Sequence, residues 1–367
     1  MSQKSNVSDE HTESFILETM DIPHYKDDVT HPRQPTVKNV TTQGLIVCLD
    51  HLHASQDETS DNNSSTNEEE ELGVADEREI SHVRFFDDDD SNTPGTEAVL
   101  YKSFGKKGNG YGQLQDAVDI KCLTDGKVIV TDIVNNKLQM FNRSGRPTAM
   151  YIADEMIEPW GLTLTTERNF AVVSRKTRLV SVISSDGQVL GTFGNECFRC
   201  PCGIVTTDDG HFVITDSVAN TVSLHNVDGD VLMYFQHDRL PFKQPRYVTV
   251  SSTTGDVIVS DSGNHCLKVF DSSGKFLRRM GAYGTADGCL KFPRGVCTDS
   301  LGNIYVADHY NNRISVFSQT GGFSCQLVTS SNGLHHPQGV AISSNQNLYI
   351  THGDLKSSQI MVFKLRP

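Results

Sequence analysis

No segment of the 367-residue sequence approaches the roughly 20 consecutive apolar residues that a membrane-spanning helix needs. The first twenty residues, MSQKSNVSDEHTESFILETM, also lack the cationic start and apolar stretch of a secretory signal. We therefore expect a cytoplasmic protein that does not contact membranes. In that compartment the nine cysteines are expected to be reduced thiols.

Zinc-ligand patterns and the common catalytic fingerprints are missing as well. CFRCPC places Cys197, Cys200 and Cys202 close together, but no second half-site follows at zinc spacing, so we expect core or loop thiols. Metal binding by these cysteines, or by histidines that meet at a channel, is kept as an alternative. No P-loop, dinucleotide fingerprint or Ser-His-Asp arrangement is present. The expectation is a protein without a cofactor, a metal or a small-molecule substrate.

The charge is distributed unevenly. Residues 1–96 hold 22 of the 46 acidic side chains but only 6 of the 32 basic ones, whereas residues 97–367 hold 24 acidic and 26 basic side chains. Segments such as SQDETSDNNSSTNEEEE combine high charge with few apolar residues, so ordering them would bury too little surface. We expect residues 1–96 to be a disordered acidic region. One exception, TQGLIVCLDHLH, predicts a stray strand or a docking segment.

A repeat of 40-odd residues dominates residues 97–367. Six segments align: KVIVTDIVNNKLQMF, NFAVVSRKTRLVSVI, HFVITDSVANTVSLH, DVIVSDSGNHCLKVF, NIYVADHYNNRISVF and NLYITHGDLKSSQIMVF. The equivalent positions, which end the second strand of each unit, are Asp132, Ser174, Asp216, Asp261, Asp308 and His352. Short apolar runs and glycine turns at this period indicate one small sheet per repeat, which is a propeller blade.

The prediction is an all-β, six-bladed propeller over residues 97–367. Residues 292–327 illustrate a unit of four strands, with glycine where hairpin turns favour a positive φ. The sixth unit stops after its third strand, and an orphan run, EAVLYKSFG (97–105), lies upstream of the first. We expect 97–105 to pair as the outer strand of the sixth blade, closing the ring and removing exposed sheet edges.

The aspartates that end the second strands have a structural explanation. A short carboxylate can accept backbone N–H groups of the loop that follows, and the asparagine three or four residues later tolerates left-handed backbone. We interpret four aspartates as turn residues and not as catalytic groups: Asp132, Asp216, Asp261 and Asp308.

The pattern P-x-G-V … G-x-I-x-V-A-D-x-x-N-x-R-I-x-V-F resembles the NHL repeat. Segments such as GNHCLKVFDSSGKFL are similar to the C-terminal propellers of the tripartite-motif (TRIM-NHL) proteins, which also carry a RING finger, B-boxes and a coiled coil. The resemblance implies a six-bladed fold that recognises protein substrates or single-stranded RNA, in ubiquitin-linked or post-transcriptional regulation. Cys48 is the one cysteine before residue 97, so the zinc-binding patterns of RING and B-box domains are missing there. No heptad pattern predicts a coiled coil before the propeller either. The resemblance therefore does not extend to ubiquitin-ligase activity.

Propeller geometry places two sets of loops on one face: those leading into strand one and those between strands two and three. Cations and rings gather in these loops, which suits single-stranded RNA, since phosphates need neutralising and bases stack on rings. A protein partner is the leading prediction and RNA the alternative, while Trp160 is either a hot spot on this face or a wedge between blades. The predicted ligand-binding residues are Arg175, Lys176, Arg178, Arg246, Arg294, Arg313, Tyr310, His309, Trp160 and Lys137.

An enzyme is the third possibility. Some propellers of similar blade pattern resemble lactonases or amidating lyases, which hold Ca²⁺ or Zn²⁺ at the channel mouth with carboxylates or histidines. Here the corresponding positions carry Val118, Trp160, Cys202, Arg246, Arg294 and Gln338. These residue types do not favour such a metal site, so we expect a non-catalytic binding module.

Overall fold

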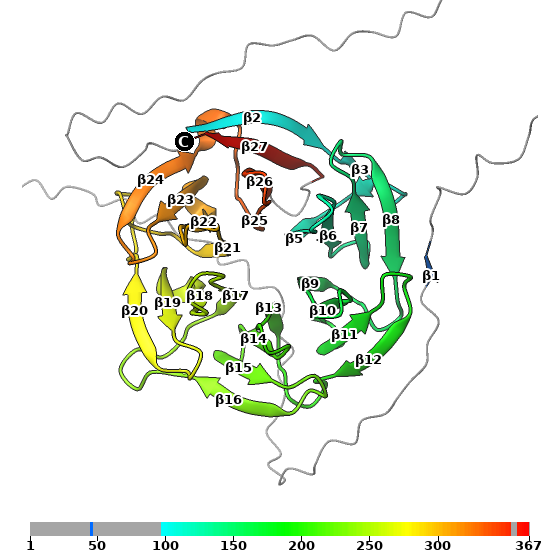
Figure 1. The fold of residues 1–367 in the computed structure, drawn as a ribbon, viewed down its shortest axis with the longest axis horizontal. Helices are drawn as coiled ribbons and strands as arrows, with labels where there is room; N and C mark the ends of the chain where they lie inside the picture. The colour runs from blue at the N-terminus through cyan, green and yellow to red at the C-terminus, as the bar shows by residue number, and fades with distance from the viewer. Residues whose placement is uncertain (1–44, 47–96, 354–357, 367) are drawn as a thin grey trace, which may run out of the picture. The chain divides into compact units, whose positions relative to one another are not determined.

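The computed structural model describes residues 45–46, 97–353 and 358–366. Six antiparallel sheets of residues 97–366 are arranged as blades around a common axis, which confirms the predicted propeller (Figure 1). The predicted disordered acidic region lies outside the described residues, except for β1 (Leu45–Ile46), which pairs with the outer strand of blade one. No helix in the described part of the chain is long and apolar enough to cross a bilayer.

The first three blades follow one another along the chain, each numbered from the axis outward. Blade one contains β5 (Ala117–Cys122), β6 (Val128–Asp132), β7 (Lys137–Phe141) and β8 (Pro147–Ile152). Blade two contains β9 (Pro159–Leu164), β10 (Phe170–Ser174), β11 (Leu179–Ile183) and β12 (Val189–Phe193). Blade three contains β13 (Pro201–Thr206), β14 (Phe212–Asp216), β15 (Thr221–His225) and β16 (Val231–Phe235).

The last three blades complete the circle. Blade four contains β17 (Pro245–Val250), β18 (Val257–Asp261), β19 (Cys266–Phe270) and β20 (Phe276–Met280), and blade five contains β21 (Pro293–Thr298), β22 (Ile304–Asp308), β23 (Arg313–Phe317) and β24 (Phe323–Val328). Blade six contains β25 (Val340–Ile342), β26 (Asn347–Thr351), β27 (Ile360–Arg366) and β2 (Glu97–Phe104). The short pair β3 (Lys106–Lys107) and β4 (Gln113–Leu114) and the 3₁₀ turns η1 (Ser262–Asn264), η2 (His309–Asn311) and η3 (Ser330–Asn332) lie in connections.

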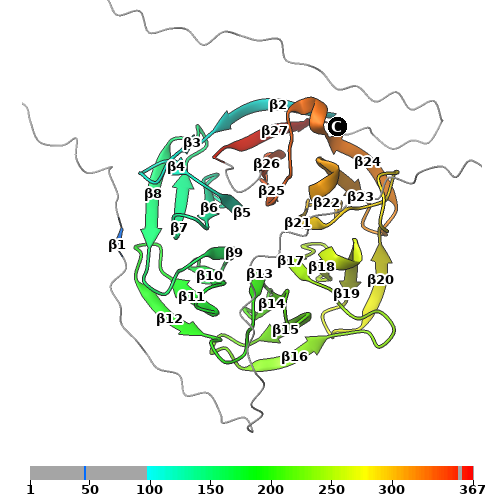
Figure 2. The same ribbon diagram turned by 180° about the vertical axis from the view of Figure 1, so that it is seen from behind.

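The ring closes as the sequence predicts. Strand β2 pairs antiparallel with β27, with Glu97 opposite Arg366 and Phe104 opposite Ile360. Figure 2 shows β2 outside β27, completing the outer wall between β24 and β8. Because β2 supplies the fourth strand of blade six, the first and last described segments of the propeller hold each other in place.

The second and third strands are the most deeply buried. Every residue of β6, β14, β18 and β22 is buried, since each blade is covered by a neighbour on both faces. The apolar clusters lie mainly between adjacent blades, as where Tyr305 of blade five joins Ile350 of blade six. These strands therefore need continuous apolar runs. A sheet buried on one face only would instead alternate apolar and polar residues along each strand.

Hydrogen bonds and close backbone contacts join each blade to the next around the axis. Thr131 Oγ1 of blade one donates to the Trp160 carbonyl of blade two (2.8 Å), and Thr351 Oγ1 of blade six donates to the Val118 carbonyl of blade one (3.0 Å). The strands approach so closely that a Cβ atom at Gly295 would lie 2.5 Å from the Gln338 carbonyl. The glycine of the repeat pattern is thus required by packing against the next blade.

The aspartates at equivalent positions of the repeats hold a different loop from the expected one. Asp132 accepts the backbone N–H groups of Gln115 and Asp116 (both 3.0 Å), which lead into strand one of the same blade. Equivalent N–H groups bind the other three carboxylates. Asp216 accepts from Arg199 and Cys200, Asp261 accepts from Lys243, and Asp308 accepts from Lys291. Among the described residues, backbone N–H groups of the following loop donate only to Asp216, which accepts from Val218 and Ala219. At Asp132, Asp261 and Asp308 the following loop instead contributes an asparagine side chain. The preceding loop needs these acceptors because it has no ladder partners of its own.

Asp308 also anchors a buried cation. The Arg313 guanidinium donates to its carboxylate (Nε to Oδ2, 2.8 Å), and Asn311 Nδ2 donates at 2.8 Å. Both partners of the ion pair are almost inaccessible, with 5% and 0% of their side chains exposed. Arg313 additionally binds three carbonyls of the loop 285–289.

The substitution Asp308→Ala should destabilise the protein by about 3–5 kcal/mol, because it leaves the buried Arg313 cation and the Lys291 N–H without their acceptor. The matched control is Ser174→Ala at the equivalent position of blade two, where the buried hydroxyl has no partner within the described chain. The control should change stability by less than about 0.5 kcal/mol. Urea unfolding of both variants measures the change in the free energy of unfolding. Equal losses in the two variants would contradict the structural role assigned to Asp308.

Removal of β2 should destabilise the whole propeller. A chain that begins at Lys106 loses the pairing of β2 with β27 and exposes β27 as an edge. Compared with a chain that begins at Glu97, it should melt at a lower temperature and scatter light on standing. Equal melting temperatures in circular dichroism would show that the ring does not depend on this closure.

Candidate functional site

The residues that lead each blade into its innermost strand surround the mouth of the central channel. Of the six predicted positions, Val118 and Cys202 are fully buried, while Arg246 and Arg294 are half-buried. Tyr247 Oη of blade four donates to the Val118 carbonyl of blade one (3.2 Å). Figure 1 shows their strands, β17 and β5, on opposite sides of the axis, so the Tyr247 side chain reaches across the centre of the ring.

Trp160 lies under two guanidinium groups. Arg175 stacks on the indole with its central carbon 4.3 Å from the ring centroid, and Arg246 lies 5.9 Å away. The indole is 6% exposed and packs with Cys202 and Tyr247. Its Nε1 has no hydrogen-bond partner within the described chain. Trp160 therefore serves as a platform that orients two arginines.

Arg294 extends the same cationic cluster. Its guanidinium donates to Gln338 Oε1, and its Nε has no partner within the described residues. Burial, and secondarily the nearby Arg246 cation, lower the pKa of Arg294 to about 10. It still carries a full charge at neutral pH, so an acceptor on a ligand would find an unsatisfied donor here.

Asp116 is a functional candidate that the sequence did not single out. Its side chain is 1% exposed, and neither carboxylate oxygen has a hydrogen-bond partner within the described residues. Burial, reinforced by Asp132 and opposed by Arg294, raises the pKa of Asp116 to about 7. The only sequence signal is that Asp116 and Ala117 stand where other blades have a residue followed by proline.

Two predicted ring residues have different environments. His309 is 4% exposed, and its Nδ1 is 3.0 Å from the Pro337 carbonyl; burial, then the Arg294 charge, lower its pKa to about 2. His309 is therefore a neutral structural group. Tyr310 is 49% exposed and packs edge-on against Phe292 and His336. Of the two, only Tyr310 offers a ring to a ligand.

Lys137 and Arg313 do not reach the ligand-binding face on which they were predicted. Lys137 is 1% exposed, and its Nζ donates to the carbonyls of Asn109, Gly110 and Gln113 (2.7–3.2 Å). Arg313 binds carbonyls of the corresponding loop of blade five and is 4% exposed. Both cations are turned inward because these loops carry carbonyl groups that no strand pairs.

The remaining predicted cations face solvent or the mouth. Lys176 and Arg178 are exposed, and Arg178 has a left-handed backbone (φ 58°). We call the surface formed by Arg175, Lys176, Arg178, Arg246, Arg294 and Tyr310 the channel-mouth face. Within the described residues, no group of three His, Cys, Asp or Glu side chains is arranged to hold a metal ion, and no disulfide joins the eight described cysteines.

The NHL-repeat family profile matches residues 242–270 and 290–317, which lie in blades four and five. The chain is an NHL-repeat β-propeller protein. It is distantly related to the E3 ubiquitin-protein ligase NHLRC1 of Homo sapiens, with 25% identity over 295 residues, 75% of this chain and 72% of the relative. The E3 ubiquitin-protein ligase TRIM32 of Homo sapiens is 23% identical over 283 residues, covering 69% of this chain and 43% of TRIM32.

Solved structures share the fold of this NHL propeller. Virginiamycin B lyase from Staphylococcus aureus superposes with a TM-score of 0.55 at 14% identity, over 74% of this chain and 100% of the lyase chain. A gluconolactonase from Xanthomonas campestris gives 0.56 at 16% identity, over 78% and 100%. At such identities the likeness shows the propeller architecture alone.

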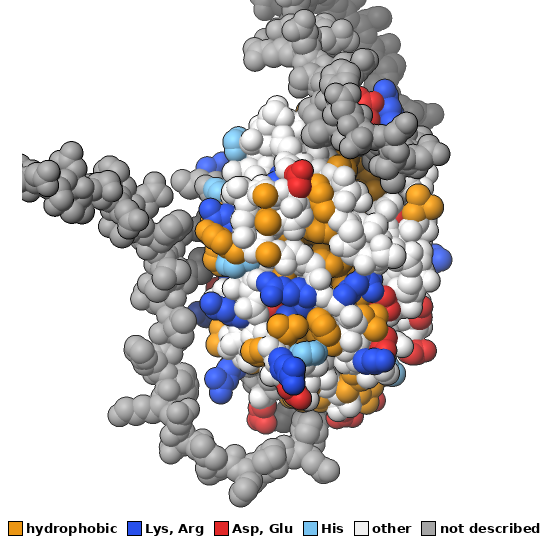
Figure 3. All heavy atoms as spheres, turned by 90° about the vertical axis from the view of Figure 1, so that its left-hand side faces the viewer, with side chains coloured by type: hydrophobic (Ala, Val, Ile, Leu, Met, Phe, Trp, Pro, Cys, Tyr) orange, Lys and Arg blue, Asp and Glu red, His pale blue; other side chains and the backbone are white. Residues whose placement is uncertain are grey.

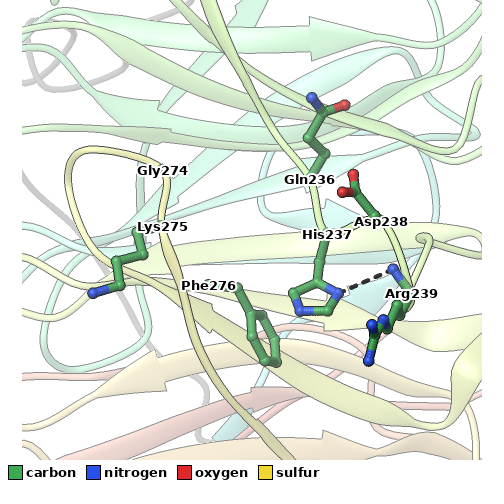
Figure 4. A pocket seen from close by; sticks show the side chains of 7 residues that line it. All are labelled: Gln236, His237, Asp238, Arg239, Gly274, Lys275 and Phe276. Carbon is green, nitrogen blue, oxygen red and sulfur yellow. Dashed lines mark hydrogen bonds between the residues drawn. The ribbon is translucent and has the colours of Figure 1, made fainter.

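Cations are also present on the outer wall of the NHL propeller. Figure 3 shows Lys and Arg side chains spread among hydrophobic ones on the side formed by β20 and β24. A depression beside this wall is lined by Gln236–Arg239 and Gly274–Phe276 (Figure 4). Its centre is occupied by His237, which packs edge-on against Phe276 (4.6 Å), while Gln236 and Lys275 point away. The depression therefore lacks polar groups that converge on a ligand.

The stability of the NHL propeller should depend on pH through Asp116. Because its pKa is raised in the folded state, folding is favoured while the carboxyl is protonated, and stability is lost as pH rises from about 4 through 7. Asp116→Asn should therefore be more stable than the parent at pH 8 by about 1–4 kcal/mol, at about 1.4 kcal/mol per pKa unit. The gain should vanish near pH 4. Urea unfolding at both pH values tests this, and a pH-independent difference would contradict it.

Proposed function

We propose that this NHL propeller is a non-catalytic recognition module that binds a protein partner at the channel-mouth face. The observation that carries the proposal is the Trp160 platform with Arg175 and Arg246 held over it, next to the under-satisfied guanidinium of Arg294. Arginine, tryptophan and tyrosine are the side chains most enriched in binding hot spots. Tyr310 adds an exposed ring to the same face.

The arrangement supports binding because it is ordered before a partner arrives. Stacking on Trp160 limits the rotamers of Arg175 and Arg246, so less side-chain entropy is lost on association. Arg294 is the cation that acts on the buried carboxyl of Asp116, whose raised pKa reduces its charge at neutral pH. An acidic loop of a partner would supply the missing negative charge.

The relatives suggest the setting of this interaction. NHLRC1 and TRIM32 are named E3 ubiquitin-protein ligases, and their alignments cover 75% and 69% of this chain. By analogy, the propeller would select a target protein in a ubiquitin-linked pathway. A RING-type catalytic role is not part of the proposal, since the sequence shows no zinc-ligand framework for one.

A catalytic role for the propeller itself has less support. The lyase and lactonase likenesses extend to the fold only. At the channel-mouth face this chain places Trp160, Arg246 and Arg294, and the Tyr247 hydroxyl bonds across the ring to the Val118 carbonyl. These groups recognise anions and aromatic surfaces, but they include no paired acid and base.

Single-stranded RNA is the second candidate ligand. Exposed Lys176 and Arg178 could neutralise phosphates, and the exposed ring of Tyr310 could stack on a base. RNA binding would weaken steeply as salt is added, because counterions are released on association. Salt dependence therefore separates this candidate from a protein interface with a buried apolar part.

The double variant Lys176→Glu plus Arg246→Glu should abolish the interaction with the partner. It reverses two charges on the channel-mouth face without removing a hydrogen bond assigned to either side chain. Crosslinking in cell extract, with mass spectrometry for proteins and sequencing for RNA, measures the loss. We expect one or a few proteins to disappear from the crosslinked set, with affinity reduced at least about tenfold, which is 1.4 kcal/mol.

The matched control is Lys275→Glu plus Arg279→Glu, which makes the same charge change at exposed positions of blade four. The control should retain the partner, and both variants should keep the melting temperature of the parent. Loss of RNA crosslinks alone would favour the second candidate. If both double variants bind all partners like the parent, the channel-mouth face is not the recognition surface.

A further inference from the structure

Blade two departs from the other repeats at one position, and the departure creates an unusual pair of side chains. Ser174 stands where four blades have aspartate, so the blade lacks the carboxylate that holds the loop leading into strand one. The next residue, Arg175, turns its guanidinium over Trp160. Its Nε donates to the sulfur of Cys200 at 3.1 Å.

Cys200 lies in a small network of hydrogen-bonding groups from blades two and three. The Cys202 thiol lies 3.2 Å from Ser217 Oγ, and that hydroxyl is 3.3 Å from the Cys200 carbonyl. The carboxylate of Asp216 accepts the Cys200 backbone N–H. The more distant charges are Glu158, near Arg175, and Arg246, near Cys202.

Arg175 has no carboxylate within salt-bridge distance among the described residues, so sulfur is its nearest acceptor. A thiolate beside a guanidinium forms a charge-assisted pair, whereas a neutral thiol is a weak acceptor. Hydrogen bonding from Cys202, together with Arg175 and Ser217, lowers the pKa of Cys200 to about 5 despite its burial. The pKa of Cys202 is raised in turn.

The other cysteines provide a contrast within the same chain. Burial raises the pKa of Cys122 to about 12 and that of Cys266 to about 11. Cys197 is exposed, but burial and the acidic Glu196 raise its pKa. Reactive cysteines combine a nearby cation with access. Cys200 keeps 9% exposure and accepts a hydrogen bond from Arg175 Nε. Arg279 lies beside Cys266, but burial keeps the pKa of that thiol raised.

We propose that Cys200 is a modification site, a thiolate paired with Arg175 that reacts with peroxide and with small soft electrophiles at the edge of the channel-mouth face. With hydrogen peroxide, the sulfur attacks one oxygen, the O–O bond breaks and hydroxide leaves. The sulfur is oxidised by two electrons to sulfenic acid, and the peroxide is reduced; the hydroxide takes its proton from solvent. Arg175 then loses its anionic acceptor, which changes the charge that the face presents.

Iodoacetamide alkylation of the full chain at pH 6 tests the proposal. Thiolate attack displaces iodide, and the site is located by mass spectrometry. Trypsin cleaves after Arg199, which places Cys197 on a separate peptide from Cys200 and Cys202. At pH 6 the thiolate population favours Cys200, whose pKa is about 5, over Cys197, whose pKa is raised above its ordinary value. The lower intrinsic nucleophilicity of Cys200 offsets only part of this difference. We therefore expect Cys200 to react faster than Cys197.

The substitution Arg175→Gln removes the cation and should slow alkylation of Cys200 at pH 6 by at least about threefold, bringing it toward the rate of Cys197. Alkylation of Cys197 and the melting temperature should stay unchanged, which excludes unfolding as the cause. Dimedone trapping after peroxide treatment should label Cys200 in the parent and give no adduct on this peptide in Cys200→Ser. The proposal is overturned if Cys200 reacts no faster than Cys197, or if Arg175→Gln leaves its rate unchanged.

Discussion

Close backbone contact between neighbouring innermost strands is the constraint on which the rest of this propeller depends. Hydroxyl groups near the end of strand two reach the carbonyl groups of the next blade, as from Thr215 to Arg246 and from Ser260 to Arg294. A side chain at the intervening glycines would collide with backbone atoms. The backbone bearing Arg246 and Arg294 is therefore fixed by interactions unrelated to ligand binding. Their side chains meet at the mouth at a spacing that the ring determines, which is how a rigid scaffold presents a recognition surface.

The least regular repeat, blade two, carries Trp160 and Arg175, which lie beside Cys200 of the connection into blade three. In blades one, three and five an asparagine with left-handed backbone accepts an N–H group from the next blade, as Asn136 does from Glu158. Blade two has Arg178 there, which cannot accept, and Ser174 in place of the aspartate. Blade two therefore lacks the hydrogen bonds that aspartate and asparagine make at these two positions in other blades. In the same region, Arg175 stacks on Trp160 and donates to Cys200. Departures from a repeat consensus are places where local rules give way to function.

The repeat period predicted the blade number, the closing strand and the second-strand ends, with strand β26 ending one residue before His352. These features follow from local patterns repeated six times. Side-chain direction was less predictable. Lys137 and Arg313 resemble surface cations in sequence, but loops from distant positions offer them carbonyl groups. Asp132 likewise binds residues sixteen and seventeen positions earlier. Asp116 gave almost no signal, because its burial depends on how blades one and five meet around the channel.

The pairing of Glu97 with Arg366 has a mechanical consequence. The two strands are antiparallel, and these partners lie at the same end of the pair. A force that separates the two segments from this end would open the hydrogen bonds one after another, as in unzipping, and would not load them together in shear. Tension applied through sequences attached at these two positions would peel the outer wall of blade six first, while the tightly stacked inner strands stayed intact.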